Sequence, residues 1–227
     1  MLSTHLRGTV QAKLPHLGQW FEEYPVPPQV RQSIANYRQQ ISAIVKGIDS
    51  RLIVVVGPCS IHDVDAAKDY AERLSRLNKK YQKDLLIVMR TYFEKPRTRA
   101  GWTGLIYDPY LDDTFNVLDG ISHARELLLS INKLELPVAT EFLDVYTFHY
   151  IADLISWGAI GARTTESQIH RQMASSLACP IGFKNGTDGS VSIAIDAIHA
   201  ASASHILVCP DNNGGLQTLK THGNQEG

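Results

Sequence analysis

Apolar residues follow two alternating patterns between about residue 50 and residue 202. Short runs in which almost every residue is apolar, such as LIVVVG from Leu52 and LLIVM from Leu85, predict buried strands. Between the runs, apolar residues return at spacings of three and four, which predicts helices with one buried face. Continuously apolar strands that alternate with helices indicate a parallel sheet covered by helices.

Five such strand–helix units follow one another. We expect strands at residues 51–57, 85–90, 136–142, 159–163 and 180–184, and helices at about 67–77, 121–131, 147–158, 166–178 and 190–202. The sheet is then either doubly wound or part of a (β/α)₈ barrel. No G-x-G-x-x-G follows the first strand and no G-x-x-x-x-G-K-[ST] occurs, which disfavours the nucleotide-binding doubly wound folds. Polar residues follow every strand, which favours a barrel whose strand ends face one site.

The two ends of the chain differ from this repeating part. Residues 1–29 are predicted to be irregular and end in the proline-rich YPVPPQ, and the apolar spacing from Val30 to Ile44 predicts one amphipathic helix that closes near Gly47. We interpret residues 1–48 as an N-terminal extension that packs on the main domain or on another subunit, and residues 49–204 as a partial barrel. In residues 205–227, HILVC and LQTLKT flank PDNNGG, which predicts a β-hairpin insert placed before a sixth barrel strand.

Composition and charge narrow the class of protein. The 227 residues are 44% hydrophobic, enough for one large core, and the net charge of -1 argues against a generally basic nucleic-acid-binding protein. The apolar runs are too short to cross a bilayer, and the first residues lack the apolar stretch of a signal peptide. Three widely spaced cysteines argue against a disulfide framework. We therefore expect a cytoplasmic protein without a membrane partner.

Charged residues after the predicted strands are mostly cations. One acid, Glu141, stands against five basic residues: Arg90, Lys95, Arg97, Arg163 and Lys184. Each alone is adequately explained as a solvated surface charge. Together, at one end of successive parallel strands, they predict a site for a strongly anionic ligand, such as phosphorylated substrates.

The GPCSIH stretch after the first strand adds a cysteine to this edge. Cys59 is either a small buried residue or a thiolate ligand for a metal beside the substrates. His62 is interpreted as a capping or supporting residue, Cys179 as a core residue, and Cys209 has no evident role. After Arg163, the TTES stretch predicts the start of a helix whose backbone N–H groups would face a phosphate.

Several longer motifs resemble one family. GPCSIHD, MRTYFEKPRT, GW.GL..DP, EFLD, SWGAIGARTTESQ.HR and GFKNGTDG resemble the microbial class I 3-deoxy-D-arabino-heptulosonate 7-phosphate synthases, from about Pro25 to the end of the chain. Stretches such as LISWGAIGARTTESQIHR and ASHILVCPDNNG are most similar to the tryptophan-sensitive isoenzymes. This family condenses phosphoenolpyruvate with erythrose 4-phosphate, the first step towards chorismate and the aromatic amino acids.

The resemblance implies roles for individual residues. Cys59 would ligate a divalent metal, manganese or iron, with zinc, cobalt or copper as alternatives. Arg90, Lys95, Arg163 and Lys184 would hold the carboxylate and phosphate of phosphoenolpyruvate, with Gly161 and Ala162 as further substrate-binding residues. Arg97 and Thr98 would bind the phosphate of erythrose 4-phosphate. Lys95, Glu141 and Lys184 would be the catalytic residues. A homo-oligomer is implied, as is a tryptophan effector site formed by the hairpin 205–221 and the helix around residues 175–178.

The family members are about half as long again, so the resemblance also implies a C-terminally truncated chain with an incomplete metal site. Two functions stay open: a synthase whose chain has been shortened, or a catalytically dead remnant that acts as a ligand-binding or subunit-interaction module. In both cases we expect the chain alone to be inactive and poorly folded. A phosphosugar aldolase of another kind is disfavoured, since no lysine stands out as a Schiff-base former.

Overall fold

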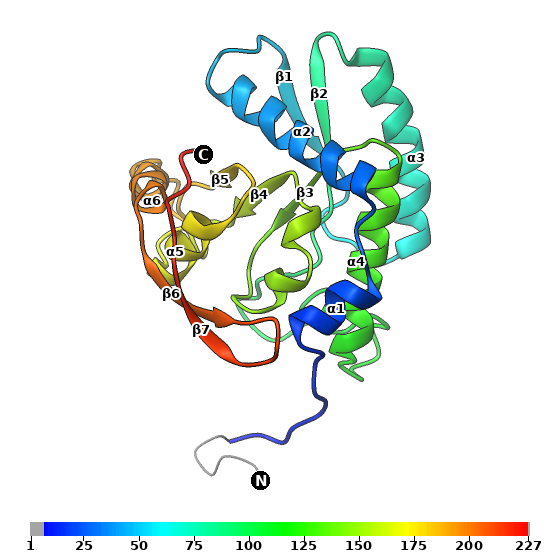
Figure 1. The fold of residues 1–227 in the computed structure, drawn as a ribbon, viewed down its shortest axis with the longest axis vertical. Coiled ribbons are helices and arrows are strands. Elements are labelled where there is room, and N and C mark those ends of the chain that lie inside the picture. The colour runs from blue at the N-terminus through cyan, green and yellow to red at the C-terminus, as the bar shows by residue number, and fades with distance from the viewer. Residues whose placement is uncertain (1–6, 227) are drawn as a thin grey trace.

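The computed structural model describes residues 7–226, and its centre is a single curled sheet of five parallel strands (Figure 1). The strands are β1 (Leu52–Val56), β2 (Leu85–Arg90), β3 (Val138–Glu141), β4 (Trp157–Ile160) and β5 (Ile181–Phe183). Each strand pairs with the next one along the chain, in the order β1-β2-β3-β4-β5. A doubly wound sheet would reverse its order at one point. The predicted barrel type is therefore confirmed, as five successive strands of a (β/α) barrel.

Four helices pack outside the sheet. They are α3 (Val64–Tyr81), α4 (Val117–Lys133), α5 (Gln168–Ser176) and α6 (Ser192–Ser202). In Figure 1, α3 and α4 lie on the right and α5 and α6 on the left. Alternate residues of β2 explain the two apolar layers. Ile87 and Met89 belong to the large cluster shared with α3 and α4, whereas Leu86 and Val88 join Ala139 in a smaller cluster on the concave face.

The helix predicted at residues 147–158 is wrong. The structure has two short 3₁₀ turns there, η1 (Thr147–Tyr150) and η2 (Ala152–Leu154), and Trp157 already begins β4. The backbone bonds within this segment are short-range i→i+3 bonds, and several of its carbonyl groups accept hydrogen bonds from distant side chains. The indole of Trp20 donates to the carbonyl of Tyr150, and Arg38 donates to those of Ala152 and Ile155. Tertiary contacts therefore override the local apolar spacing.

The N-terminal region contains two helices, α1 (Leu17–Glu23) and α2 (Pro28–Val45). The prediction of irregular structure up to residue 29 is wrong at α1, and its first six residues lie outside the described part. Pro28 is the first residue of α2, a position at which a helix needs no N–H donor. Ile41 of α2 packs against the concave cluster of the sheet, so this helix closes the inner face of the barrel segment.

A buried arginine ties this region to the barrel. Arg125 of α4 is fully buried, and its guanidinium makes two hydrogen bonds, of 2.7 and 2.9 Å, to the carboxylate of Asp153. It also donates to the carbonyls of Tyr24 and Tyr150. All of its hydrogen-bonding faces are thus used within the fold.

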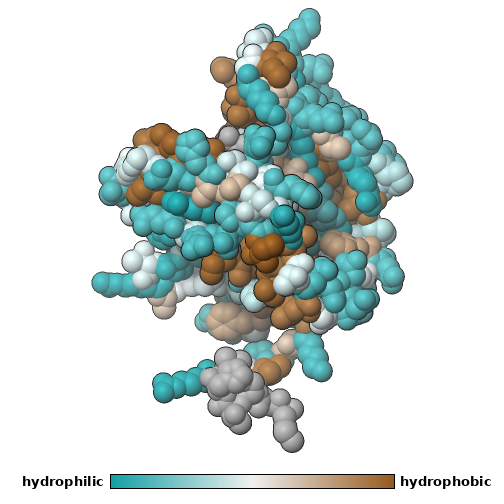
Figure 2. All heavy atoms as spheres, turned by 60° about the vertical axis from the view of Figure 1, so that its left-hand side comes forward, coloured by the Kyte–Doolittle hydropathy of each residue, from teal (hydrophilic) through white to brown (hydrophobic). Residues whose placement is uncertain are grey.

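The predicted hairpin is confirmed as β6 (Ile206–Pro210) and β7 (Leu216–Lys220), paired antiparallel. Its tip reaches α1, where the N–H of Gly18 donates to the carbonyl of Asn212 (Figure 1). On its outer face Ile206, Val208 and Leu216 are exposed, and brown apolar patches interrupt the polar surface on the side that Figure 2 brings forward. No helix within residues 7–226 is long and apolar enough to cross a membrane.

Candidate active site

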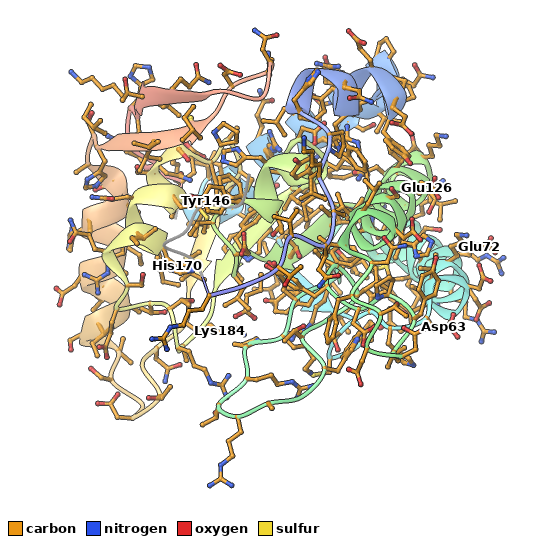
Figure 3. The ribbon with its side chains drawn as sticks, turned by 90° about the horizontal axis from the view of Figure 1, so that it is seen from below. Asp63, Glu72, Glu126, Tyr146, His170 and Lys184 are labelled. Carbon is orange, nitrogen blue, oxygen red and sulfur yellow. The ribbon has the colours of Figure 1, made fainter. Side chains whose placement is uncertain are left out.

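The predicted cations meet a cysteine and an acid where the strands end. The Nζ atom of Lys95 lies 3.2 Å from the Sγ atom of Cys59, and the Nζ atom of Lys184 lies 3.8 Å from a carboxylate oxygen of Glu141. These four residues come from β3 and from the segments directly after β1, β2 and β5. Figure 3 shows Lys184 at this end of the molecule. Parallel strands bring their carboxyl ends to one edge, so residues far apart in sequence share one site.

Arg90, the last residue of β2, is held from two sides. Its Nε and Nη2 atoms donate to the carbonyls of Pro58 and Cys59, at 3.1 and 3.0 Å. Its guanidinium carbon lies 3.6 Å from the centre of the Tyr92 ring, as in a cation–π contact. A side chain at Gly57 would meet the backbone of Arg90, with its Cβ only 2.6 Å from the carbonyl oxygen. The glycine of GPCSIH thus permits the close approach of the β1 and β2 ends.

Tyr92 was not among the residues singled out from the sequence. Its ring is 5% exposed and lies under Arg90, with the Nζ atom of Lys184 5.4 Å from the ring centre. Burial raises the pKa of its hydroxyl above the ordinary value, and the Arg90 charge works against that rise. One signal was available. In an extended segment residues i and i+2 face the same side, which would have placed Tyr92 beside Arg90.

The thiol of Cys59 is exposed and surrounded by positive charge. The hydrogen bond from Lys95 is the largest cause of a lowered pKa for this thiol, and the charges of Lys95, Arg90 and Lys184 act in the same direction. Within residues 7–226 no group of three or more His, Cys, Asp or Glu side chains is close enough to hold a metal ion. The described residues therefore provide one candidate ligand rather than a coordination sphere.

Some neighbours of Cys59 differ from the sequence interpretation. His62 is exposed, and the residue that caps α3 is Asp63, which accepts a hydrogen bond from the N–H of Ala66. Asp63 lies well away from Lys184 in Figure 3. Cys179 is buried, as predicted for a core residue, and burial raises the pKa of its thiol to about 11.

Glu141 and Gly161 form a matched pair at the ends of β3 and β4. Glu141 is 7% exposed, and a Cβ atom at Gly161 would overlap its carboxylate oxygen. A larger residue at this position would therefore push the carboxylate of Glu141 out of its place beside Lys184. The hydroxyl of Thr165 lies 2.9 and 2.7 Å from the carbonyl oxygens of Gly161 and Lys184, and so ties the ends of β4 and β5 together. Thr165 was considered only as part of a helix start, which is wrong.

The remaining predicted site residues lie on the loops after β2 and β4. Thr98 and Arg163 are exposed, Ala162 is half-buried, and the Nε atom of Arg97 donates to the carbonyl of Trp102 at 2.6 Å. α5 begins only at Gln168 and is capped by Ser167. The expected position of a helix N-terminus directly after Arg163 is therefore wrong, because Gly161–Ser167 form turns first.

A separate cavity of about 200 Å³ lies beneath the hairpin; we call it the hairpin pocket. Its walls come from residues 145–149 after β3, from one side of α5, and from the inner face of the hairpin: Leu207, Cys209 and Leu219. The walls are mainly apolar, with Ser176 and His149 as polar groups. Such a lining suits a small molecule with an aromatic ring.

A barrel segment with cations, an acid and a thiol at its strand ends defines the class of protein: a (β/α) barrel whose charged groups gather at the carboxyl ends of its strands. The chain belongs to the DAHP synthetase I family, whose sequence pattern matches residues 27–225.

Individual relatives agree with this assignment. The chain is 59% identical over 204 residues to the Trp-sensitive phospho-2-dehydro-3-deoxyheptonate aldolase of Escherichia coli K12, covering 90% of this chain and 59% of that protein. It is 56% identical over 206 residues to the Trp-sensitive phospho-2-dehydro-3-deoxyheptonate aldolase of Salmonella typhimurium LT2. This match covers 91% of this chain and 59% of that protein. The solved phospho-2-dehydro-3-deoxyheptonate aldolase of Francisella tularensis superposes with a TM-score of 0.91 at 45% identity, covering 96% of this chain and 64% of that one. The chain thus spans about 59% of the length of the curated relatives.

Proposed function

We propose that this chain carries the substrate-binding part of a 3-deoxy-7-phosphoheptulonate synthase, which condenses phosphoenolpyruvate with erythrose 4-phosphate. The observation that supports the proposal is the meeting of Arg90, Lys95 and Lys184 around Cys59 and Glu141 at one end of the sheet. Phosphoenolpyruvate carries a carboxylate and a phosphate on adjacent atoms. Cations from the ends of β2 and β5 match this concentrated negative charge.

In the proposed reaction, the enol carbon of phosphoenolpyruvate bonds to the aldehyde carbon of erythrose 4-phosphate. Water adds to the adjacent carbon, and the C–O bond to phosphate breaks to release inorganic phosphate. Arg90 is already fixed by two carbonyls and a ring, so it binds an anion with little further loss of freedom. Lys95 and Lys184 hold the substrate charges, and Glu141 exchanges a proton beside the reacting carbons.

The outer residues complete the proposed substrate sites. Arg97 and Thr98 would bind the phosphate of erythrose 4-phosphate, since their loop extends beyond Lys95. Arg163, with Gly161 and Ala162, would extend the phosphoenolpyruvate site from the end of β4. Cys59 would contribute a ligand to a divalent metal, manganese or iron, which would polarise the aldehyde. Since residues 7–226 supply this one ligand, the steps above use only the side chains that the structure describes.

Regulation and assembly are further parts of the proposal. Two relatives are named Trp-sensitive. The hairpin pocket has mainly apolar walls from the hairpin and from α5, and Ser176 of α5 adds a polar group. We therefore infer that tryptophan binds in the hairpin pocket. The homo-oligomer and the cytoplasmic location remain predictions from the sequence.

Calorimetric titration of the purified chain with phosphoenolpyruvate tests the binding site. We expect binding that Lys95→Gln weakens at least tenfold, while the matched control Lys79→Gln, on the exposed end of α3, leaves it unchanged. The chain extended with the C-terminal part of the E. coli relative tests the reaction, through release of phosphate from both substrates. Absence of phosphoenolpyruvate binding in the chain and of phosphate release in the extended chain would refute the proposed function.

A further inference from the structure

Glu94 is a buried acid that the proposed reaction does not use, although it precedes Lys95 in the chain. It is 5% exposed, and its carboxylate lies against the loop that follows β3. One oxygen accepts hydrogen bonds from the N–H groups of Leu143 and Asp144, at 3.2 and 3.3 Å, and the other accepts one from the hydroxyl of Thr147 at 2.9 Å. A single side chain therefore joins the basic loop after β2 to residues 143–147.

Residues 143–147 are held as one unit. A carboxylate oxygen of Asp144 accepts from the N–H groups of Tyr146 and Thr147, at 2.6 and 3.0 Å, and its other oxygen accepts from the hydroxyl of Tyr107 at 2.7 Å. The ring of His170, in α5, lies 2.7 Å from the carbonyl oxygen of Leu143. Figure 3 shows Tyr146 and His170 in the same part of the molecule. These hydrogen bonds rigidify residues 143–147, because a fully satisfied polar network favours a single arrangement.

The same unit forms a wall of the hairpin pocket. Val145 and Tyr146 line the cavity together with Phe148 and His149 directly after them. Glu94 thus contacts the loop that faces the pocket, and the next residue, Lys95, has its Nζ atom 3.2 Å from Cys59. The N–H of Lys95 donates to the carbonyl of Thr103, a residue of the same loop.

We propose that Glu94 couples the hairpin pocket to Lys95, so that an aromatic amino acid in the pocket changes the affinity for phosphoenolpyruvate. The inference rests on the proposed function, because it uses the phosphoenolpyruvate site and the tryptophan site assigned there. A ligand that displaces residues 143–147 displaces the carboxylate bonded to them, and with it the ammonium group one residue further along. The change in coupling free energy when this carboxylate is replaced measures how much of the coupling passes through Glu94.

The ionisation of Glu94 supports this role. Burial raises its pKa to about 7, against the three hydrogen bonds that it accepts. The titratable groups that face it are Asp144, whose charge raises this pKa further, and Tyr107, whose own pKa the charge of Glu94 raises. The carboxylate accepts all three bonds, and protonation converts one oxygen into a donor. We therefore expect stronger coupling at pH 8 than at pH 6.

The test is calorimetric titration of the purified chain with phosphoenolpyruvate, with and without saturating tryptophan. In the wild type we expect tryptophan to change the dissociation constant at least fivefold. In Glu94→Gln the dissociation constants with and without tryptophan should be nearly equal, so that their ratio is close to one. Thr147→Val removes one of the three hydrogen bonds and should reduce the effect of tryptophan. Thr140→Val is the matched control, because it removes a buried hydroxyl that donates to the carbonyl of Thr91, outside residues 143–147.

The outcomes separate the two claims. If both ligands bind and Glu94→Gln keeps the wild-type ratio, the coupling role is refuted while the proposed function stands. If the two ligands bind independently in the wild type, the coupling role is refuted as well. If the chain binds no phosphoenolpyruvate, the proposed binding site fails and the inference fails with it. Should Glu94→Gln not fold, the effect of tryptophan on the dissociation constant of phosphoenolpyruvate is compared between Thr147→Val and Thr140→Val. An equal effect in these two variants refutes the inference.

Discussion

Replacing Glu94 by glutamine should change how the stability of the fold depends on pH. The pKa of Glu94 is about 7 in the folded chain, against an ordinary value of 4.5, because burial opposes the charged form. Between these two values the folded state keeps a proton that the unfolded state has released. Stability therefore falls as pH rises through this window and is constant above it. Glutamine carries no titratable proton, so this contribution is absent in the variant.

The size of the effect follows from the shift in pKa. One pKa unit corresponds to about 1.4 kcal/mol, so a shift from 4.5 to about 7 amounts to about 3 kcal/mol. The side chain is 5% exposed, so little of this is lost to screening by solvent. Glutamine has nearly the same size as glutamate, so the variant leaves no cavity, but its amide group donates where the carboxylate oxygen accepts, and the bond to the hydroxyl of Thr147 is lost or reversed.

Urea denaturation followed by circular dichroism, at half-unit steps from pH 4.5 to pH 8, measures this difference. Histidines and other acids also titrate in this range, but they are common to both proteins and cancel in the comparison. We expect the free energy of unfolding of Glu94→Gln, relative to that of the wild type, to rise by about 3 kcal/mol between pH 4.5 and pH 8. Parallel stability curves for the two proteins would show that Glu94 is not protonated in the folded chain near neutral pH, and the reasoning from burial would be wrong.

Three further predictions concern other parts of the molecule. Arg125→Met should lower the free energy of unfolding by about 1–3 kcal/mol, because it leaves the carbonyl of Tyr24 without a donor and removes the partner of Asp153; an unchanged urea midpoint would contradict this. Tyr92→Leu should weaken phosphoenolpyruvate binding about tenfold in calorimetry, and Tyr92→Phe should retain it, because the ring face holds Arg90; equal losses would exclude a role for the ring. Iodoacetamide should label Cys59 in the native chain and spare the two buried cysteines, and mass spectrometry that finds rapid labelling at all three would argue against this fold.

The sequence predicts a segment correctly where its local pattern and its tertiary environment favour the same secondary structure. LLIVM is apolar on both faces because β2 has α3 and α4 on one side and the concave cluster on the other. The turn-rich PDNNGG joins two strands whose side chains alternate, so the hairpin could be read locally. The concentration of cations at one edge was also predictable, because parallel strands place their carboxyl ends together.

The errors occur where distant residues satisfy the backbone. Residues 147–158 have helical apolar spacing, but several of their carbonyl groups accept hydrogen bonds from the side chains of Trp20, Arg38 and Arg125. None of these three donors is near the segment in sequence. α1 contains no predicted helical repeat. It is stabilised by burial of Leu17 and Trp20 and by the contact of Gly18 with the hairpin tip. Short helices depend on such packing, since propensity alone is too weak to form them.

The sequence by itself therefore determined the five parallel strands, four of the helices between and after them, the hairpin and the chemical character of the strand-end site, because each depends on periodicity and on residue type. Only the tertiary structure decided which groups touch. It placed Tyr92 under Arg90, Lys95 against Cys59, and Glu94 between the site and the hairpin pocket. These contacts join loops that are up to 53 residues apart in sequence. Their geometry depends on how the curled sheet brings the ends of distant strands together, which no local pattern specifies.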